Sequence, residues 1–597
     1  MTKRYAHLIS IGSMILIFSL LFSNLGGIIT YAFSGEAPLQ EGLNQAKQLT
    51  QQGDIDQAIQ AYSDILSKDG TVLPAYLERG KLYDQLGDIK SAKSDFTAVL
   101  AINPENVEAL QHRIRIFLQE KNPTLALVDL QTLTGLQPTD FNTFLLSGDY
   151  YLQIKNYSLA AANFTSALHM QSQNLEALLG RAEANVNLSA LDDAQADITA
   201  AQLLDPLNVQ AVNLQGQLFY NQQNYTKALS EWQKVVELSG DSPAMANFRG
   251  KAYFNLAEYD KAITAWNEAI AMDDSQGTVY ALRAKAYALM NDMPAAEADL
   301  LKANQLLPQN VEVLSDLGLV YMNEGDIENA VSTYDKAIQL APKQAILYFR
   351  RGNAKRQLDD LQGAVEDYSQ CVELEPDNYD ALNNRGISYM DLGEYELAQD
   401  DFKKALSITP NYPLSLINSG VAYIRTGQPQ LAVDQLTTAI DQDSGYLTAY
   451  DFRAQAYYLL GEYQAAIDDW NVVLAEEPDS PLAYDWIGRS YNALQQYQNA
   501  LDALDQALQL SPDLGDAYYQ KGLALLEMKR YKDSLLQLDQ AIARKSNLDL
   551  AYFNSGVCHV NLGQSSIAIQ EFQKVLEISQ NPDLIALTQS VLKDLQQ

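Results

Sequence analysis

The sequence contains few of the residues that form metal sites and covalent cross-links. Its two cysteines, Cys371 and Cys558, lie far apart in the chain and belong to no CxxC motif. No pair of histidines stands beside either of them at the spacing of metal ligands. This pattern excludes a disulfide framework and a zinc site. We expect each cysteine to be a small, buried apolar residue.

Histidine is scarce as well, with four residues in a chain of 597. The sequence has no HExxH motif, no glycine-rich phosphate-binding loop and no GxSxG motif. Catalysis requires a positioned nucleophile, base or metal, and the chain offers no segment outside its repeats that could hold one. We therefore expect that the protein is not an enzyme and uses no cofactor.

Basic residues are few relative to acidic ones. The chain has 41 Lys and Arg against 75 Asp and Glu, which gives a formal net charge of -34. Phosphate backbones bind through clusters of Lys and Arg, and so large an acidic excess repels them. We expect no nucleic-acid partner.

The N-terminus carries the longest uncharged stretch of the chain. Lys3 and Arg4 precede a segment without charge at residues 8–34, and Glu36 follows it. Basic residues before an apolar segment and acidic residues after it place the N-terminus in the cytoplasm and export the rest. The stretch exceeds the roughly 20 residues that span a bilayer, which favours a retained anchor with the repeat domain outside the cytoplasm. Cleavage near Ser34, which would release a soluble exported protein, is the alternative.

The remainder of the chain repeats every 34 residues. One position of the repeat is alanine in fifteen of sixteen rows and Ser534 in the other. The alanines are Ala58, Ala92, Ala126, Ala160, Ala194, Ala228, Ala262, Ala296, Ala330, Ala364, Ala398, Ala432, Ala466, Ala500 and Ala568. Gly or Ala stands twelve residues earlier in every row except that of Ile114, and Pro ends nine rows at one place. Two small residues allow two helices to approach closely and Pro ends a helix, so each row predicts a helix–turn–helix unit.

The pattern resembles the tetratricopeptide repeat family, whose signature combines Gly, Tyr, Ala, a large aromatic residue and Pro at this period. The resemblance implies an all-α fold, a right-handed superhelical solenoid of sixteen 34-residue repeats. We divide the chain into a targeting segment at 1–34, repeats at 35–580 and a C-terminal capping helix at 581–597. Leu584, Leu587, Val591 and Leu595 form one apolar stripe on that last helix, as a cap requires.

Arginine directly precedes the small residue in eight rows, and Asp follows sixteen residues later in seven of these. We interpret these residues as ion pairs between the two helices of one repeat, rather than as a basic ladder for a partner. The clearest examples are Arg79 with Asp95, Arg351 with Asp367, Arg385 with Asp401, and Arg453 with Asp469.

The resemblance also implies that the first helices line a concave surface on which other proteins bind. Basic residues directly after the small residue are Lys47, Lys81, Arg115, Lys251 and Lys285. The densest polar cluster on this surface falls in repeats ten to twelve, and it is our first candidate for partner binding; solvation alone is the alternative. It comprises Arg350, Asn353, Arg356, Asn384, Asn418 and Arg425.

Trp486, Tyr519 and Phe553 are a second candidate, since aromatic residues are frequent binding anchors. They are equally well explained by packing between repeats. Taken together, these features predict a non-catalytic protein-interaction scaffold or assembly factor at the cell envelope, which binds peptide segments or helices of partner proteins. A carrier for polysaccharide or another export cargo is the alternative, with glycan as the less favoured ligand.

Overall fold

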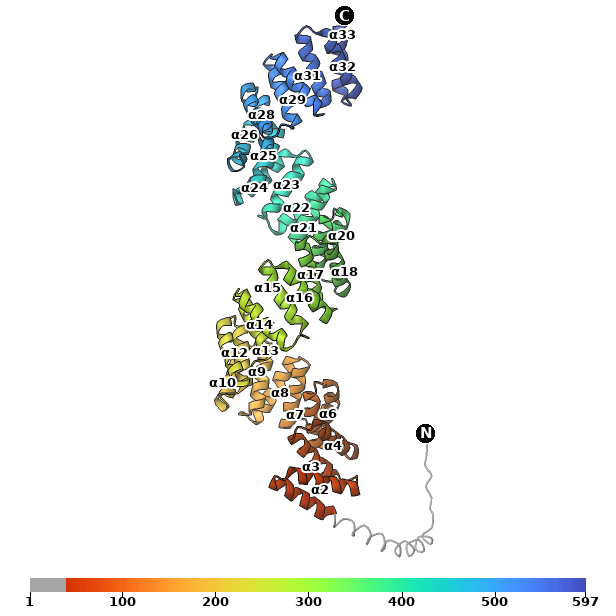
Figure 1. Ribbon diagram of the computed structural model, residues 1–597, viewed down its shortest axis with the longest axis vertical. Helices are drawn as coiled ribbons and strands as arrows, with labels where there is room; N and C mark the ends of the chain where they lie inside the picture. The colour runs from red at the N-terminus through yellow and green to blue at the C-terminus, as the bar shows by residue number, and fades with distance from the viewer. Residues whose placement is uncertain (1–38, 597) are drawn as a thin grey trace, which may run out of the picture. The chain divides into compact units, whose positions relative to one another are not determined.

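The computed structural model describes residues 39–596, and every regular element in this range is an α-helix (Figure 1). The chain divides into two compact units, with the boundary between Ala286 and Tyr287. We call the described parts of these the first unit (39–286) and the second unit (287–596). The predicted solenoid of 34-residue helical repeats is confirmed. The targeting segment predicted at 1–34 lies outside the described residues.

Each repeat consists of a first and a second helix. Residues 39–52 are helical and open the first repeat. The following first helices are α3 (Leu73–Gln85), α5 (Val107–Gln119), α7 (Phe141–Gln153), α9 (Leu175–Asn187), α11 (Val209–Asn221), α13 (Pro243–Asn255), α15 (Gly277–Leu289), α17 (Val311–Glu324), α19 (Ala345–Gln357), α21 (Tyr379–Asp391), α23 (Pro413–Arg425), α25 (Leu447–Leu460), α27 (Pro481–Ala493), α29 (Gly515–Glu527) and α31 (Leu548–Asn561).

The second helices alternate with these. They are α2 (Ile55–Lys68), α4 (Ile89–Ile102), α6 (Pro123–Leu136), α8 (Tyr157–Met170), α10 (Leu191–Leu204), α12 (Tyr225–Ser239), α14 (Tyr259–Met272), α16 (Met293–Leu306), α18 (Ile327–Leu340), α20 (Leu361–Leu374), α22 (Tyr395–Ile408), α24 (Pro429–Gln442), α26 (Tyr463–Glu476), α28 (Tyr497–Leu510), α30 (Tyr531–Ala543) and α32 (Ser565–Ile578). The predicted capping helix is α33 (Pro582–Leu595), which packs on α32.

The turn inside each repeat has the same backbone conformation. The residue five positions before the recurring alanine, such as Gly325 or Ala257, has a positive φ in all sixteen rows. This reverses the chain within two or three residues, and in seven of the described repeats the following Asp or Asn then caps the second helix through its side chain. Asp326, for example, accepts a hydrogen bond from the backbone N–H of Asn329, which satisfies one free donor of the first turn. The strict spacing of helix starts follows from this turn.

The two helices of a repeat pack through a small residue on one and a large side chain on the other. Trp232 and Trp266 of the second helices are buried against Gly216 and Gly250 of the first helices. The repeated alanines are fully buried as well. Side chains larger than these would separate the helices, which explains why the small positions recur.

Six of the predicted Arg–Asp pairs are present as two-bond pairs between Nε and Nη2 of the arginine and both carboxylate oxygens. In Arg385 and Asp401 both distances are 2.6 Å. The same arginines make a third bond through Nη1 to the second helix of the preceding repeat. Their partners there are Ser63, Thr97, Thr165, Asp335, Ser369 and Thr437.

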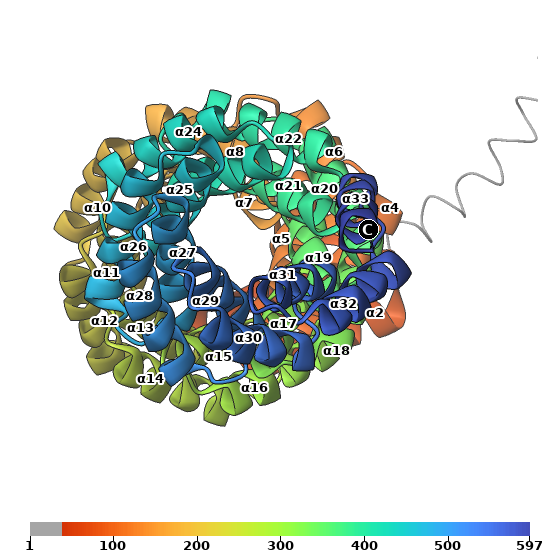
Figure 2. The ribbon, with the colours of Figure 1, turned by 90° about the horizontal axis from the view of Figure 1, so that it is seen from above.

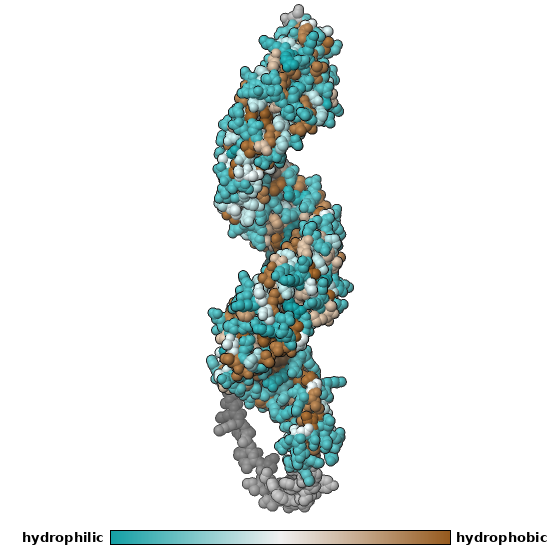
Figure 3. All heavy atoms as spheres, turned by 60° about the vertical axis from the view of Figure 1, so that its left-hand side comes forward, coloured by the Kyte–Doolittle hydropathy of each residue, from teal (hydrophilic) through white to brown (hydrophobic). Residues whose placement is uncertain are grey.

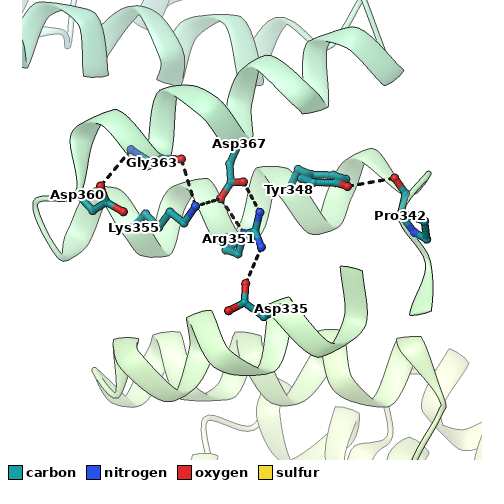
Figure 4. A network of polar contacts seen from close by, with 8 residues as sticks. All are labelled: Asp335, Pro342, Tyr348, Arg351, Lys355, Asp360, Gly363 and Asp367. Carbon is teal, nitrogen blue, oxygen red and sulfur yellow. Dashed lines mark hydrogen bonds and ion pairs between the residues drawn. The ribbon is translucent and has the colours of Figure 1, made fainter. Parts of the chain in front are cut away.

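The arginine therefore joins three helices, and we call this set an arginine clip. Figure 4 shows one example, in which Arg351 lies between Asp367 of its own repeat and Asp335 of the preceding one, with Lys355 also bonded to Asp367. Arg249 departs from the pattern. It pairs with Asp241 and Glu268, because Ala265 stands where the other rows have Asp.

Consecutive first helices contact each other within each unit, as in α5 with α7 and α27 with α29. Figure 2 shows these helices on the inner side of their unit's curve, with α6, α8 and α28 outside. The face visible in Figure 3 is mostly hydrophilic, with hydrophobic residues scattered over it. Within residues 39–596, no helix combines the length and apolar character needed to cross a bilayer.

Candidate functional site

The polar cluster predicted in repeats ten to twelve forms a network of bonds between its own residues. Asn353 accepts hydrogen bonds from Tyr368 Oη at 2.7 Å and from Asn384 Nδ2 at 3.0 Å. Asn418 donates to the buried Asn383. The amides of α19, α21 and α23 are thereby ordered along the inner side of the second unit.

The three arginines of this predicted cluster have different environments. Arg350 donates to Ser315 Oγ at 2.7 Å, in the preceding repeat. Arg356 lowers the pKa of the buried Tyr368 hydroxyl, although burial is the larger effect and raises that pKa to about 12. Arg425 is exposed at the end of α23. Binding by this cluster stays a prediction.

The aromatic residues Trp486, Tyr519 and Phe553 each pack on core residues. Trp486 stacks on Trp470 with ring centroids 5.5 Å apart, and Phe553 contacts Phe572 edge to face. Tyr519 is buried, and its hydroxyl accepts a hydrogen bond from Asn554. These contacts account for all three residues as packing, the alternative that the sequence left open, and binding by them stays a prediction.

A cavity of the first unit lies elsewhere, in repeats five to eight. It has a volume of about 730 Å³. Its lining comes from α9, α11, α12, α13, α14 and α15, and so mainly from first helices. The helices α11, α13 and α15 are packed less closely than α5, α7, α9 and α11. The cavity opens in this wider spacing.

The floor of the cavity is aromatic. Trp232 and Trp266, the only tryptophans of the first unit, contribute their rings. Phe248 stacks on Trp232 with centroids 5.1 Å apart, and Phe254 lies 5.9 Å from Trp266. The Nε1 atom of Trp266 donates to Asn247, whereas Nε1 of Trp232 is buried without an acceptor. Such a floor favours an apolar side chain.

Lys251 supplies a cationic group at this apolar site. It stands on α13 directly after Gly250, is partly buried, and has no carboxylate within ion-pair distance in the described part of the chain. Burial lowers the pKa of its ammonium group, because removing a charge from water disfavours the charged form. A ligand carboxylate would offset this cost.

Three asparagines at the same position of repeats five, six and seven line one side of the cavity: Asn187, Asn221 and Asn255. Asn221 donates to the backbone oxygen of Val186 at 3.0 Å, and Asn255 donates to Tyr220 Oη at 2.7 Å. These bonds use N–H groups and fix the orientation of the amides. The amide oxygens can then accept hydrogen bonds from the backbone of an extended ligand.

Acidic residues follow on the neighbouring first helices. Asp149 of α7 and Glu183 of α9 occupy the position that Lys251 occupies on α13. Burial, with the charge of Glu176 next in size, raises the pKa of Asp149 to about 7, against a smaller opposing effect of Arg115. Burial also raises the pKa of Glu183. Neither carboxylate forms an ion pair that satisfies it within the described residues.

The repeat pattern predicts Lys251 and Lys285 on the inner surface but does not predict a cavity there. The alternation of acidic and basic residues after the small position was the available signal. The cavity itself depends on the spacing of α11, α13 and α15, and no sequence motif encodes that spacing.

Comparison with protein-family models gives matches along most of the chain. Models described as tetratricopeptide repeats match residues 73–106, 145–196, 186–243, 379–412, 418–481 and 550–582, and a TPR repeat model matches 318–358, 352–393 and 488–529. No curated protein matches the sequence.

Solved structures similar to this chain include the Cut9–Hcn1 hetero-tetramer of the APC/C, at 16% identity and a TM-score of 0.38, covering 74% of this chain and 95% of that one. A tetratricopeptide repeat protein from Parabacteroides merdae has 20% identity and a TM-score of 0.34, covering 42% and 98%. MamA has 26% identity and a TM-score of 0.27, covering 28% and 92%.

The family matches lie between residue 73 and residue 582 and together cover more than half of the sequence. Repeats of this kind indicate a protein–protein interaction scaffold. The chain belongs to the tetratricopeptide repeat family.

Proposed function

We propose that this protein is a scaffold or assembly factor of the cell envelope, which holds extended segments of partner proteins on the inner surface of its first helices. The cavity of repeats five to eight is the principal binding site, and we call it the proposed seat. The observation that carries this proposal is the partly buried Lys251, which stands without an ion pair beside an aromatic floor and a row of amides.

Each part of the cavity has a separate task in this proposal. The ring of Phe248, which stacks on the buried Trp232, contacts an apolar side chain of the partner, and this contact supplies most of the affinity. The amide oxygens of Asn221 and Asn255 accept hydrogen bonds from its backbone. Lys251 binds a carboxylate, which fixes the register of the segment because a partly desolvated cation tolerates few other partners.

The amide network around Asn353 and Asn384 is a second proposed contact surface, in the second unit. Its side chains are already held by bonds to each other, so a ligand would meet a preorganised surface. Arg425, which is exposed, would add a charge at its edge.

The location is proposed from the N-terminus. Lys3 and Arg4 before the uncharged stretch at 8–34 favour an anchored protein whose repeats lie outside the cytoplasm. A soluble exported form, cleaved near Ser34, is the second possibility. The size of the protein in cells, compared with that of the full-length chain made in vitro, distinguishes the two.

The proposed seat is tested by photo-crosslinking in cells. A benzoylphenylalanine residue is introduced at Gln217, which lines the cavity, and in a matched variant at Gln233, which is exposed on the neighbouring second helix α12. We expect protein adducts at Gln217 that Lys251→Gln reduces, and none of these at Gln233. Equal adducts at both positions would contradict the proposed seat.

The cargo-carrier alternative gives a different result in the same experiment. Glycan adducts at Gln217 in place of protein adducts would favour it. The tryptophans of the cavity offer this alternative no support, because Trp232 and Trp266 are buried. Sugar rings stack on exposed aromatic faces.

A further inference from the structure

The inner position that directly follows the small residue changes its charge in an ordered way across repeats three to seven. The residues at this position are Arg115, Asp149, Glu183, Gln217 and Lys251. They stand on α5, α7, α9, α11 and α13, and the first four of these helices contact one another in order. The row therefore lies along one surface of the first unit, with an acidic section and then a basic residue.

The acidic section has an excess of charge that the protein itself does not balance. Burial and the negative charge of Glu176 raise the pKa of Asp149 more than Arg115 lowers it, and Glu183 adds further negative charge. Glu183 has a single weak polar contact, from Gln210 at 3.5 Å. At the other end, no described carboxylate pairs with Lys251. Unbalanced charges of opposite sign thus stand at two places on one surface.

The space between these charges is suited to an apolar side chain. Tyr220 of α11 and Phe248 of α13 line the cavity together with Lys251. Asn187 stands one turn after Glu183 on α9 and also lines the cavity. The acidic section and the cavity are therefore continuous along α9.

We propose that the natural ligand of this surface is a bipolar peptide segment, with a basic side chain at Asp149 and Glu183, an acidic side chain at Lys251 and an apolar residue between them. This inference rests on the proposed function. Packed helices lie about 8 to 10 Å apart, and α11 and α13 are spaced more widely than this, so the distance from α9 to α13 is roughly 20 Å or more. An extended chain covers this distance in about six residues.

The shifted pKa values agree with this geometry. Burial raises the pKa of Asp149 and Glu183 and lowers that of Lys251. Each charged form is therefore disfavoured in the free protein. A ligand with opposite charges at both ends stabilises all three charged forms together, whereas a ligand with one kind of charge meets repulsion at one end.

The test uses four fluorescein-labelled peptides with acetylated and amidated ends, and the full-length chain. The bipolar peptide carries two arginines and two glutamates, separated by five residues that include leucine and tyrosine. The second and third peptides have arginine or glutamate at both ends, and the fourth has glutamine at both. Fluorescence anisotropy gives the four dissociation constants. We expect the bipolar peptide to bind about tenfold more tightly than the neutral one, as one or two partly desolvated charge pairs provide.

Charge reversal separates recognition from loss of folding. With Lys251→Glu both ends of the surface are acidic, so the preferred peptide should become the one with arginine at both ends. With Asp149→Lys and Glu183→Lys it should become the one with glutamate at both ends. Lys234→Glu, on the second helix α12, changes the net charge by as much as Lys251→Glu does. It should leave the bipolar peptide as the tightest ligand.

The outcomes distinguish this inference from the function on which it rests. Suppose that all four peptides bind equally and that crosslinking or substitution at Gln217 reduces this binding. This result would overturn the bipolar ligand but would still support peptide binding at the cavity. A Lys251→Glu protein that still prefers the bipolar peptide would also overturn it. Failure of every peptide to bind would count against both the inference and the proposed seat.

Discussion

A Cβ atom built on Gly216 would lie 2.5 Å from Nε1 of Trp232. Non-bonded atoms do not approach this closely, so the indole ring occupies the space that a larger residue would need. The contact joins the first and second helices of repeat six, and Trp232 is also part of the floor of the proposed binding cavity. Packing and the site are therefore coupled at this residue.

Replacing Gly216 by alanine should destabilise this repeat. The added methyl group would force the Trp232 ring to move, and overpacking of this kind costs about 2 kcal/mol. Hydrogen exchange of the α11 and α12 amides and thermal unfolding measure the effect. The control is Gly135→Ala on α6, where an added Cβ meets nothing within 4 Å. That change should slightly stabilise the protein, and equal effects of the two substitutions would contradict the proposed role of the contact.

The arginine clips should contribute more to stability than exposed ion pairs. In Asp401→Asn, the partly buried Arg385 loses the charge that compensates it, and we expect a loss of about 3 kcal/mol. Ser369→Ala removes one bond of the same clip and should cost about 1 kcal/mol. Glu577→Gln removes the exposed partner of Lys574 and should leave the unfolding curve unchanged. A similar loss from all three substitutions would count against the clip.

The acidic section should make stability fall as the pH rises toward neutrality. The pKa of Asp149 is raised to about 7 in the folded protein, whereas an unfolded Asp titrates near 4. Between these values the folded state binds more protons than the unfolded state, so stability decreases with pH and levels off above about pH 7. Besides burial, the groups responsible are Glu176 and Glu183 of α9, opposed by Arg115 of α5.

Asp149→Asn removes this titration. Its effect on the free energy of unfolding of the first unit should therefore be more stabilising at pH 8 than at pH 5. Glu176→Gln should move the midpoint to lower pH without removing it. Amide exchange of α7 and α9 between pH 4 and pH 8, or carboxyl chemical shifts, report the midpoint. If the stability of Asp149→Asn depends on pH in the same way as that of the unchanged protein, the titration belongs to another group.

The turn between the two helices of a repeat offers a reciprocal pair of substitutions. Ala257 has a positive φ there, and Gly325 occupies the same position two repeats later. A side chain in the left-handed region costs about 1 kcal/mol. Ala257→Gly should therefore raise the stability of its repeat and Gly325→Ala should lower it by a similar amount, as seen in thermal unfolding. Effects of the same sign in both would show that the turn is not limited by this conformation.

The sequence was sufficient to predict the helices because one unit recurs with constant spacing. The repeats of the chain can then be compared with one another, as related sequences are. The partners Arg385 and Asp401 could be inferred from rows in which both occur or both are missing. The third partner, Ser369, was not inferred, because Ser, Thr and Asp fill that position in different rows and their shared role as acceptors is visible only in the structure.

The candidate site was less accessible to sequence reasoning. Polar residues around Asn353 were numerous enough to suggest binding, yet many of their bonds are to each other. Lys251 attracted notice only as one of several basic residues. Its lack of a partner, its burial and the aromatic floor beside it are consequences of helix spacing, which a repeat pattern of small and large residues does not specify.

The arginine clips have a mechanical consequence. Repeats ten, eleven and thirteen carry Arg351, Arg385 and Arg453, each tied to the repeat before it, whereas Ser419 stands at this position in repeat twelve and is too short to reach across. The joint between repeats eleven and twelve is held instead by bonds from uncharged donors, in which Ser415 and Asn418 both donate to Asn383. Tension along the second unit would therefore load charge-assisted arginine contacts at some joints and weaker bonds from uncharged donors at this one, so the spacing of arginines along the chain divides the unit into joints of unequal strength.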